Sequence, residues 1–121
     1  MLSATCHCGA VGIELPQRPA AVTNCNCSIC RRYGVLWAYY EVGAVRISGH
    51  PEHTEAYVWG DRMLQFVRCR HCGCVTHWEP LPGQSQGRMA VNVRNFEPEV
   101  LGDFRIRRFD GAQSWRFLDE P

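Results

Sequence analysis

The sequence predicts a single, mainly β domain of antiparallel strands that covers residues 1–121. The chain is long enough to bury one hydrophobic core. Hydrophobic residues make up 45% of the chain and charged residues 21%, close to the globular average, so disorder is not favoured. About eight or nine short runs of β-branched and aromatic residues recur, with turn signals every 8–12 residues. That pattern is typical of antiparallel sheets.

The charge and hydropathy of the chain argue against two classes of partner. The formal net charge is +1 and the pI is near 7.6, so nothing indicates binding to nucleic acid or to an anionic membrane. The longest apolar run is far shorter than the ~18 residues that a membrane span needs. Residues 1–5 are too few for a signal peptide before the first cysteine. We therefore expect a cytoplasmic protein with reduced cysteines and with neither nucleic-acid nor membrane partners.

The first expected strand, at residues 5–15, begins with two thiols. Cys6 and Cys8 are two positions apart, so an extended backbone would point both toward one face. The apolar residues that follow alternate with glycine and glutamate until Pro16 ends the strand. A second short strand is expected at residues 20–24.

A turn or short helix is predicted at residues 27–33, where Asn26 or Ser28 could cap its first turn. In such a helix Cys27 and Cys30 are i and i+3 neighbours, which brings their thiols close enough to share a metal ion.

The rest of the chain is predicted to be mostly β. The pairs Gly60-Asp61 and Asp110-Gly111 mark tight hairpin turns, and one further helical turn is expected at residues 97–101. Short strands are expected at residues 35–42, 45–48, 55–59, 63–68, 75–79, 88–94, 103–109 and 114–118.

Seven of the eight cysteines fall in three clusters. A disulfide framework would have ~105 connectivities, but closely spaced C-x-C and C-x-x-C groups reach one another poorly and chelate metal well. Division into four and three thiols gives a closed structural zinc site and a second zinc site with one open position. Other divisions of the ligands are also compatible with the spacing. On this division the structural ligands are Cys6, Cys8, Cys69 and Cys72, and the open site consists of Cys25, Cys27 and Cys30.

Two arginines directly follow the middle cluster. Arg31 and Arg32 would attract an anion or a carboxylate-bearing substrate to the open position, and they are our candidate catalytic residues. The alternative is that they are ordinary surface charges. A fourth protein ligand, such as Cys74 or a histidine, would close the middle site and make it structural.

Three ordered motifs resemble the glutathione-dependent formaldehyde-activating enzyme (GFA) family, which includes centromere protein V. They cover residues 5–77, and residues 91–94 resemble a later strand of that family. The resemblance implies an antiparallel β-tent fold with a structural zinc on the first and third clusters and a catalytic zinc on the middle one. The motifs are Cys6-His7-Cys8-Gly9, Cys25-Asn26-Cys27-Ser28-Ile29-Cys30-Arg31-Arg32 and Phe66-Val67-Arg68-Cys69-Arg70-His71-Cys72-Gly73.

The family's named reaction adds the thiol of glutathione to formaldehyde, and its reverse breaks a carbon–sulfur bond. The resemblance therefore implies a carbon–sulfur lyase that uses two zinc ions, a small thiol such as glutathione, and formaldehyde or another small carbonyl. Arg31 or Arg32 would bind a substrate carboxylate, with Asn92 or Arg94 as further polar contacts. The alternative function is a non-catalytic, zinc-stabilised binding module.

The remaining notable residues are expected to be structural. Cys74 is predicted to be a buried, inert thiol, and His77 a hydrogen-bonded core or supporting histidine rather than a metal ligand. The other expectations are that His7 and His71 face solvent and that Trp37, Tyr39 and Tyr40 pack in the core or on a sheet face.

Overall fold

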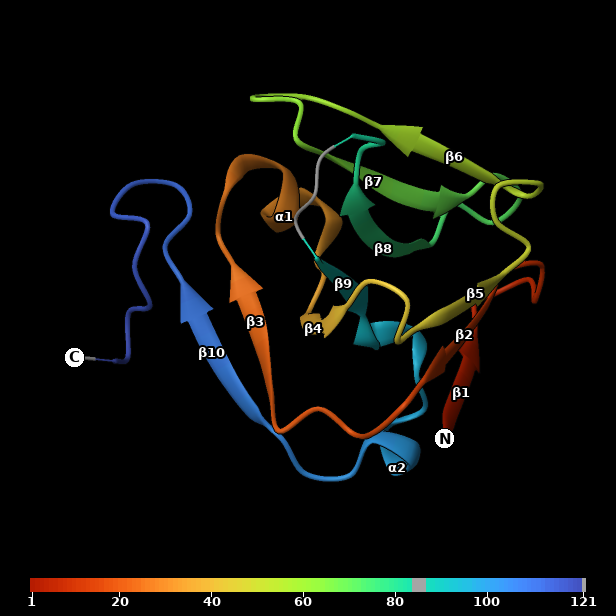
Figure 1. Cartoon of the computed structure of the whole chain (residues 1–121). Helices are drawn as coiled ribbons and strands as arrows, with labels where there is room; N and C mark the ends of the chain where they lie inside the picture. The colour runs from red at the N-terminus through yellow and green to blue at the C-terminus, as the bar shows by residue number, and fades with distance from the viewer. Residues whose placement is uncertain (84–86, 121) are drawn as a thin grey trace.

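The computed structural model describes residues 1–83 and 87–120, which form two β-sheets (Figure 1). The smaller sheet has three strands in the order β1-β2-β5, and the larger has seven in the order β10-β3-β4-β9-β8-β7-β6. The predicted mainly β fold with few short helices is confirmed. The strands are β1 (Leu2–Thr5), β2 (Gly12–Leu15), β3 (Ala21–Cys25), β4 (Trp37–Glu41), β5 (Arg46–Ser48), β6 (Thr54–Tyr57), β7 (Leu64–Cys69), β8 (Val75–Pro80), β9 (Arg88–Asn92) and β10 (Arg105–Phe109).

The helical segments in the described residues are short: α1 (Ser28–Tyr33), the 3₁₀ turn η1 (Val93–Asn95) and α2 (Pro98–Leu101). The N-cap of α1 is Cys27, whose sulfur accepts the Cys30 N–H, so the predicted cap at Asn26 or Ser28 is wrong. A search of the described residues finds no helix with the length and apolar character needed to cross a membrane.

The expected strand at residues 5–15 is instead two strands joined by a turn. β1 ends at Thr5, which pairs with Gly12 at the start of β2. The Gly9 N–H donates to the Cys6 carbonyl, and Gly9 takes a φ of +87°, which glycine adopts without strain. The prediction of a single strand was wrong because this turn folds the chain back on its own first residues.

The C-terminal region departs from the predicted antiparallel pattern. β10 pairs with β3 in parallel, from Arg105 opposite Ala21 to Phe109 opposite Cys25. Residues 114–118 do not form the expected strand.

Two features of the backbone account for the missing strand. Trp115 takes a φ of +61°, which interrupts an extended backbone, and only a single bridge joins Phe109 to Phe117. The strand expected at residues 88–94 ends at Asn92, where η1 begins.

The central strand β4 of the larger sheet is buried on both of its faces. Along β4, Ala38 and Tyr40 belong to the core cluster that includes Ile13 and Leu15 of the smaller sheet. Trp37 lies in a second cluster, with the middle cysteines. Because side chains alternate along a strand, one face packs on the smaller sheet and the other supports the cysteine trio.

Candidate metal centres

The first cluster joins the two sheets through thiols from the turn after β1 and from the end of β7. The sulfur of Cys8 lies 3.7 Å from that of Cys6 and 3.6 Å from that of Cys69. The sulfur of Cys72 completes the group, and all four lie within 4.8 Å of one another. Sulfurs bound at about 2.3 Å to one tetrahedral zinc would be about 3.8 Å apart. The observed spacing therefore fits a zinc ion, and these are the four thiols grouped from the sequence.

Backbone N–H groups point at the sulfurs of this cluster. The Val11 N–H donates to Cys6 Sγ and the His71 N–H to Cys69 Sγ, each over 3.4 Å. Gly73 closes the second turn with a φ of +81°, and its N–H donates to the Cys69 carbonyl. Such donors favour the thiolate form that metal binding requires.

Cys74 lies beside the first cluster but does not belong to the group of four. Its side chain is half-buried rather than buried as predicted, because the residue still lies in the turn before β8. Burial raises the pKa of the Cys72 thiol, but the backbone N–H groups of Cys74 and Cys8 bring it down to about 5. His7 and His71 are exposed, as expected.

The second cluster is built where β3 leads into α1. Cys25 ends β3, Cys27 caps α1 and Cys30 lies within the helix, and their three sulfurs lie within 4.8 Å of one another. Across residues 1–83 and 87–120, no fourth cysteine, histidine or acidic ligand joins this group. The trio can therefore hold a zinc ion and leave one tetrahedral position open.

A shared proton distinguishes two thiols of the trio. The side-chain hydrogen bond from Cys30 lowers the pKa of Cys25 to about 6, although burial acts in the opposite direction. The backbone N–H groups of Cys27 and Gly111 also stabilise the Cys25 thiolate. The same thiol–thiol contact raises the pKa of Cys30. Before metal binds, Cys25 is thus the sulfur closest to the ligating form.

Aromatic side chains support the trio on its face of the larger sheet. The Trp37 side chain is buried, and its indole N–H donates to Cys30 Sγ over 3.3 Å. Trp37 lies against Phe66, whose ring meets Tyr33 edge-on with centroids 5.8 Å apart. The predicted packing of Trp37, Tyr39 and Tyr40 is confirmed, with Trp37 also bonding a thiol.

A C-terminal loop that the sequence analysis did not connect to the trio packs against it. The Asn26 side chain donates to Asp110 Oδ1 and accepts the Ala112 N–H, each over 3.0 Å. This holds Gly111 so close that a Cβ there would lie 2.8 Å from Cys25 Sγ. The sequence signal is Asn26, the polar residue between two ligands, for which the sequence analysis predicts only a helix-capping role.

The two candidate arginines are both exposed at the end of α1. Arg32 donates to the Ser28 carbonyl of its own helix over 2.8 Å. The Arg31 backbone N–H donates to the Cys27 carbonyl over 3.0 Å. Within residues 1–83 and 87–120, the Arg31 side chain makes no hydrogen bond or ion pair, so its guanidinium group is unengaged in the fold.

The further polar contacts suggested from the sequence do not lie at the trio. The Asn92 amide donates to the Val75 carbonyl over 2.9 Å, and its oxygen accepts the Leu36 N–H. Asn92 therefore uses both ends of its amide to connect neighbouring segments of the fold. Arg94 lines a surface hollow with Cys6, on the side of the first cluster, so it is not a contact of the trio.

Comparison with known proteins identifies the family. The sequence profile described as glutathione-dependent formaldehyde-activating enzyme matches residues 1–103. The chain belongs to this GFA family. A crystal structure of a Rhodobacter sphaeroides protein is similar, with 33% sequence identity and a TM-score of 0.69. The alignment covers 87% of this chain and 99% of that one. Membership in the GFA family confirms the resemblance seen in the three cysteine motifs.

The first testable prediction compares one ligand from each cluster of this GFA-family protein. We expect Cys69→Ser to be insoluble or largely unfolded, because structural zinc supplies on the order of 10 kcal/mol and a domain's net stability is only ~5–15 kcal/mol. Cys27→Ser should fold, since serine is itself a good N-cap for α1. It should keep one zinc ion and lose the second. Thermal melts and elemental analysis of both variants measure this.

The same two variants can also contradict the assignment of the trio as an open, non-structural site. If Cys27→Ser unfolds as completely as Cys69→Ser, the trio is a structural centre and its open position has no chemical role.

A second prediction concerns the loop that packs on the trio. In Gly111→Ala the new methyl group would meet Cys25 Sγ at 2.8 Å and the Cys27 Cβ at 3.1 Å. Overpacking costs about 1–3 kcal/mol, so we expect cobalt affinity at the trio to fall about 10- to 100-fold while the first cluster keeps its metal. Gln113→Ala, an exposed position in the same loop, is the control. Equal affinities in the two variants would mean that the loop does not constrain the trio.

Proposed function

We propose that this protein is a zinc-dependent carbon–sulfur lyase of the GFA type. It would reversibly add a small thiol, glutathione or a similar compound, to formaldehyde or another small carbonyl. The observation that carries the proposal is the trio of Cys25, Cys27 and Cys30, whose sulfurs converge without a fourth protein ligand among the described residues. A site built only to stabilise the fold is normally closed by four ligands.

Different residues of this chain would bind the zinc ion and the substrate carboxylate. Cys25, Cys27 and Cys30 would hold a zinc ion, which would supply a position at which a substrate thiol loses its proton. Arg31, exposed beside the trio, would bind a substrate carboxylate and orient the thiol. In the overall reaction the sulfur bonds to the carbonyl carbon and the thiol proton ends on the new hydroxyl oxygen, so no oxidant or reductant is needed.

The state of the cysteines supports a reducing compartment. None of the eight is in a disulfide in this structure, and metal ligation by cysteine is typical of proteins whose surroundings keep thiols reduced. We therefore propose that the reaction takes place in the cytoplasm, where a small thiol is available as the partner.

A third prediction tests the open position. We expect glutathione at millimolar concentration to change the thiolate charge-transfer bands of the cobalt-substituted protein, because a fourth sulfur joins the trio. Cys27→Ser, which lacks one ligand of the trio, should not show the change. Absence of any response to glutathione and to other small thiols would favour the non-catalytic binding module.

A fourth prediction concerns Arg31. A hydrogen bond to a charged group contributes about 1.5–3 kcal/mol. Arg31→Ala should therefore raise KM about 10- to 100-fold for glutathione and leave it unchanged for 2-mercaptoethanol, which has no carboxylate. Arg94→Ala, on the side of the first cluster, is the control. An equal effect of Arg31→Ala on both thiols would exclude a carboxylate contact.

A further inference from the structure

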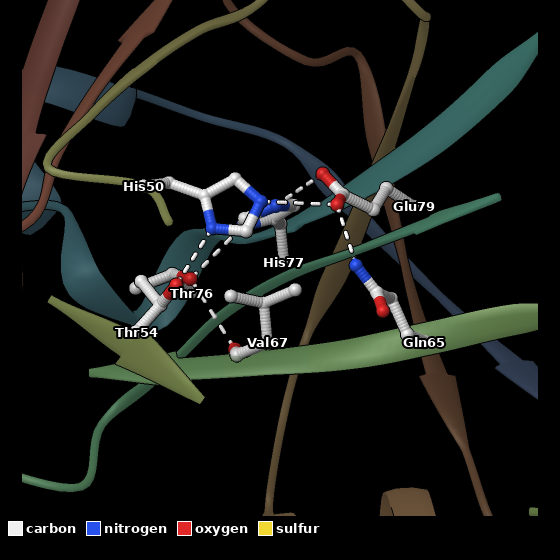
Figure 2. Close-up of polar contacts among 7 residues, drawn as sticks. All are labelled: His50, Thr54, Gln65, Val67, Thr76, His77 and Glu79. Carbon is white, nitrogen blue, oxygen red and sulfur yellow. Dashed lines mark hydrogen bonds and ion pairs between the residues drawn. The ribbon is translucent and has the colours of Figure 1, made fainter. Parts of the chain in front are cut away.

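A third group of metal-ligating side chains lies apart from both cysteine clusters (Figure 2). The Nε2 atoms of His50 and His77 both face the carboxylate of Glu79. His50 Nε2 lies 3.0 Å from Oε2, and His77 Nε2 lies 2.9 Å from Oε1. The two imidazole rings are nearly perpendicular, with centroids 5.1 Å apart. Two nitrogens and a carboxylate thus converge on one point.

The register of the larger sheet brings these side chains together. His77 and Glu79 are two positions apart on β8, so they share a face, and His50 approaches from the segment between β5 and β6. The intervening residue, Trp78, packs on the opposite face with the cysteine trio. The histidine–carboxylate group is therefore separated from the trio by the sheet itself.

A hydroxyl group lies at the second ring nitrogen of His77. The Thr76 hydroxyl lies 3.2 Å from the Val67 carbonyl, to which it can donate. Its oxygen also lies 2.9 Å from His77 Nδ1, as Figure 2 shows, so it can accept the Nδ1–H at the same time. In the tautomer that carries its proton on Nδ1, the Nε2 of the neutral ring presents a lone pair to Glu79.

In that tautomer the Nε2 lone pair of His77 faces a carboxylate oxygen of Glu79 at 2.9 Å. A cation bound by both atoms would remove the repulsion between them. His50 Nε2, 3.0 Å from the other carboxylate oxygen, is close enough to be a third ligand of the same cation.

We propose that His50, His77 and Glu79 form a third metal site, for a divalent first-row transition ion such as zinc. Two imidazole nitrogens and one carboxylate oxygen suit such an ion better than calcium or magnesium, which prefer oxygen ligands. His77 itself is fully buried, whereas the side chains of Glu79 and His50 are 27% and 20% exposed. An ion can therefore enter from solvent and keep an open position there.

The surroundings of the three ligands match those of known metal sites. A metal-binding histidine usually donates its other ring N–H to an oxygen. Thr76 supplies that oxygen for His77, and the Thr54 hydroxyl lies 2.7 Å from His50 Nδ1. Gln65 donates to Glu79 Oε2 over 2.7 Å. Ligands on one tetrahedral zinc are about 3.3 Å apart, so the two partly exposed side chains need to move outward by only about 0.3–0.4 Å.

The fifth prediction tests the third site on protein whose two cysteine clusters are already filled with zinc. Cobalt added to this protein should bind one further equivalent, with weak visible bands and without the thiolate charge-transfer bands of a cysteine site. Supporting groups around a metal are worth 10–100-fold in affinity, so loss of a direct ligand in His50→Gln or Glu79→Gln should weaken binding by more than about 100-fold. The control is His53→Gln, an exposed histidine 3.1 Å from His71 and outside the group.

The test does not need a substitution at the buried His77, which could impair folding. His50 is partly exposed, so His50→Gln can remove a ligand with less effect on the core. Failure of zinc-filled protein to bind further cobalt at millimolar concentration, or equal binding by His50→Gln, would overturn the proposal. A long-range ¹H–¹⁵N spectrum that shows a proton on His77 Nε2 at pH 7, unchanged by added zinc, would also overturn it. That result would assign the group to a hydrogen-bonded histidine–carboxylate pair. These outcomes do not depend on thiol binding at the cysteine trio.

Discussion

The four-thiol cluster is the constraint on which the two-sheet arrangement depends. The strands of the smaller sheet contain only three or four residues each, and so short a sheet is not stable by itself. Cys6 and Cys8 connect its first turn to Cys69 at the end of β7, 61 residues further along the chain. A metal that closes so long a loop removes much conformational entropy from the unfolded chain. With the two sheets held together at this cluster, the apolar core between them can form.

The cysteine trio differs from that cluster because it closes a local segment. Cys25, Cys27 and Cys30 lie within one strand end and one helical turn, so a metal there constrains little of the chain. Its position instead comes from the sheet beneath it, through the Trp37 indole, and from the C-terminal loop held by Asn26. Under the proposed function, folding and reactivity would thus depend on different sets of sulfurs, which would allow an open coordination position without loss of the fold.

Local chemistry explains what the sequence predicted correctly. The C-x-C and C-x-x-C spacings act within a few residues, so each local cysteine cluster and the mainly β fold could be read directly. The pairing of the first cluster with the third was one of several divisions that the spacing allowed, because it joins residues 61 positions apart. The predictions were wrong where contacts between residues far apart in the sequence determine the structure. The parallel pairing of β10 with β3 and the contact between Asn26 and Asp110 join residues more than 80 positions apart. No local signal encodes such pairings, and the Asp110-Gly111 dipeptide suggested an ordinary hairpin.

The histidine–carboxylate group was also only partly predictable from the sequence. Alternation along β8 predicts that His77 and Glu79 share a face, but His50 joins them only through the sheet register and the path between β5 and β6. His77 is hydrogen-bonded in the core, as predicted. A polar role in the core and a ligand role are compatible, because the hydroxyl that satisfies one ring nitrogen orients the other. Alternation along β8 directs Trp78 to the face that supports the cysteine trio and His77 and Glu79 to the other. If the proposed third site binds metal, one strand separates a sulfur site from a nitrogen and oxygen site within a single small domain.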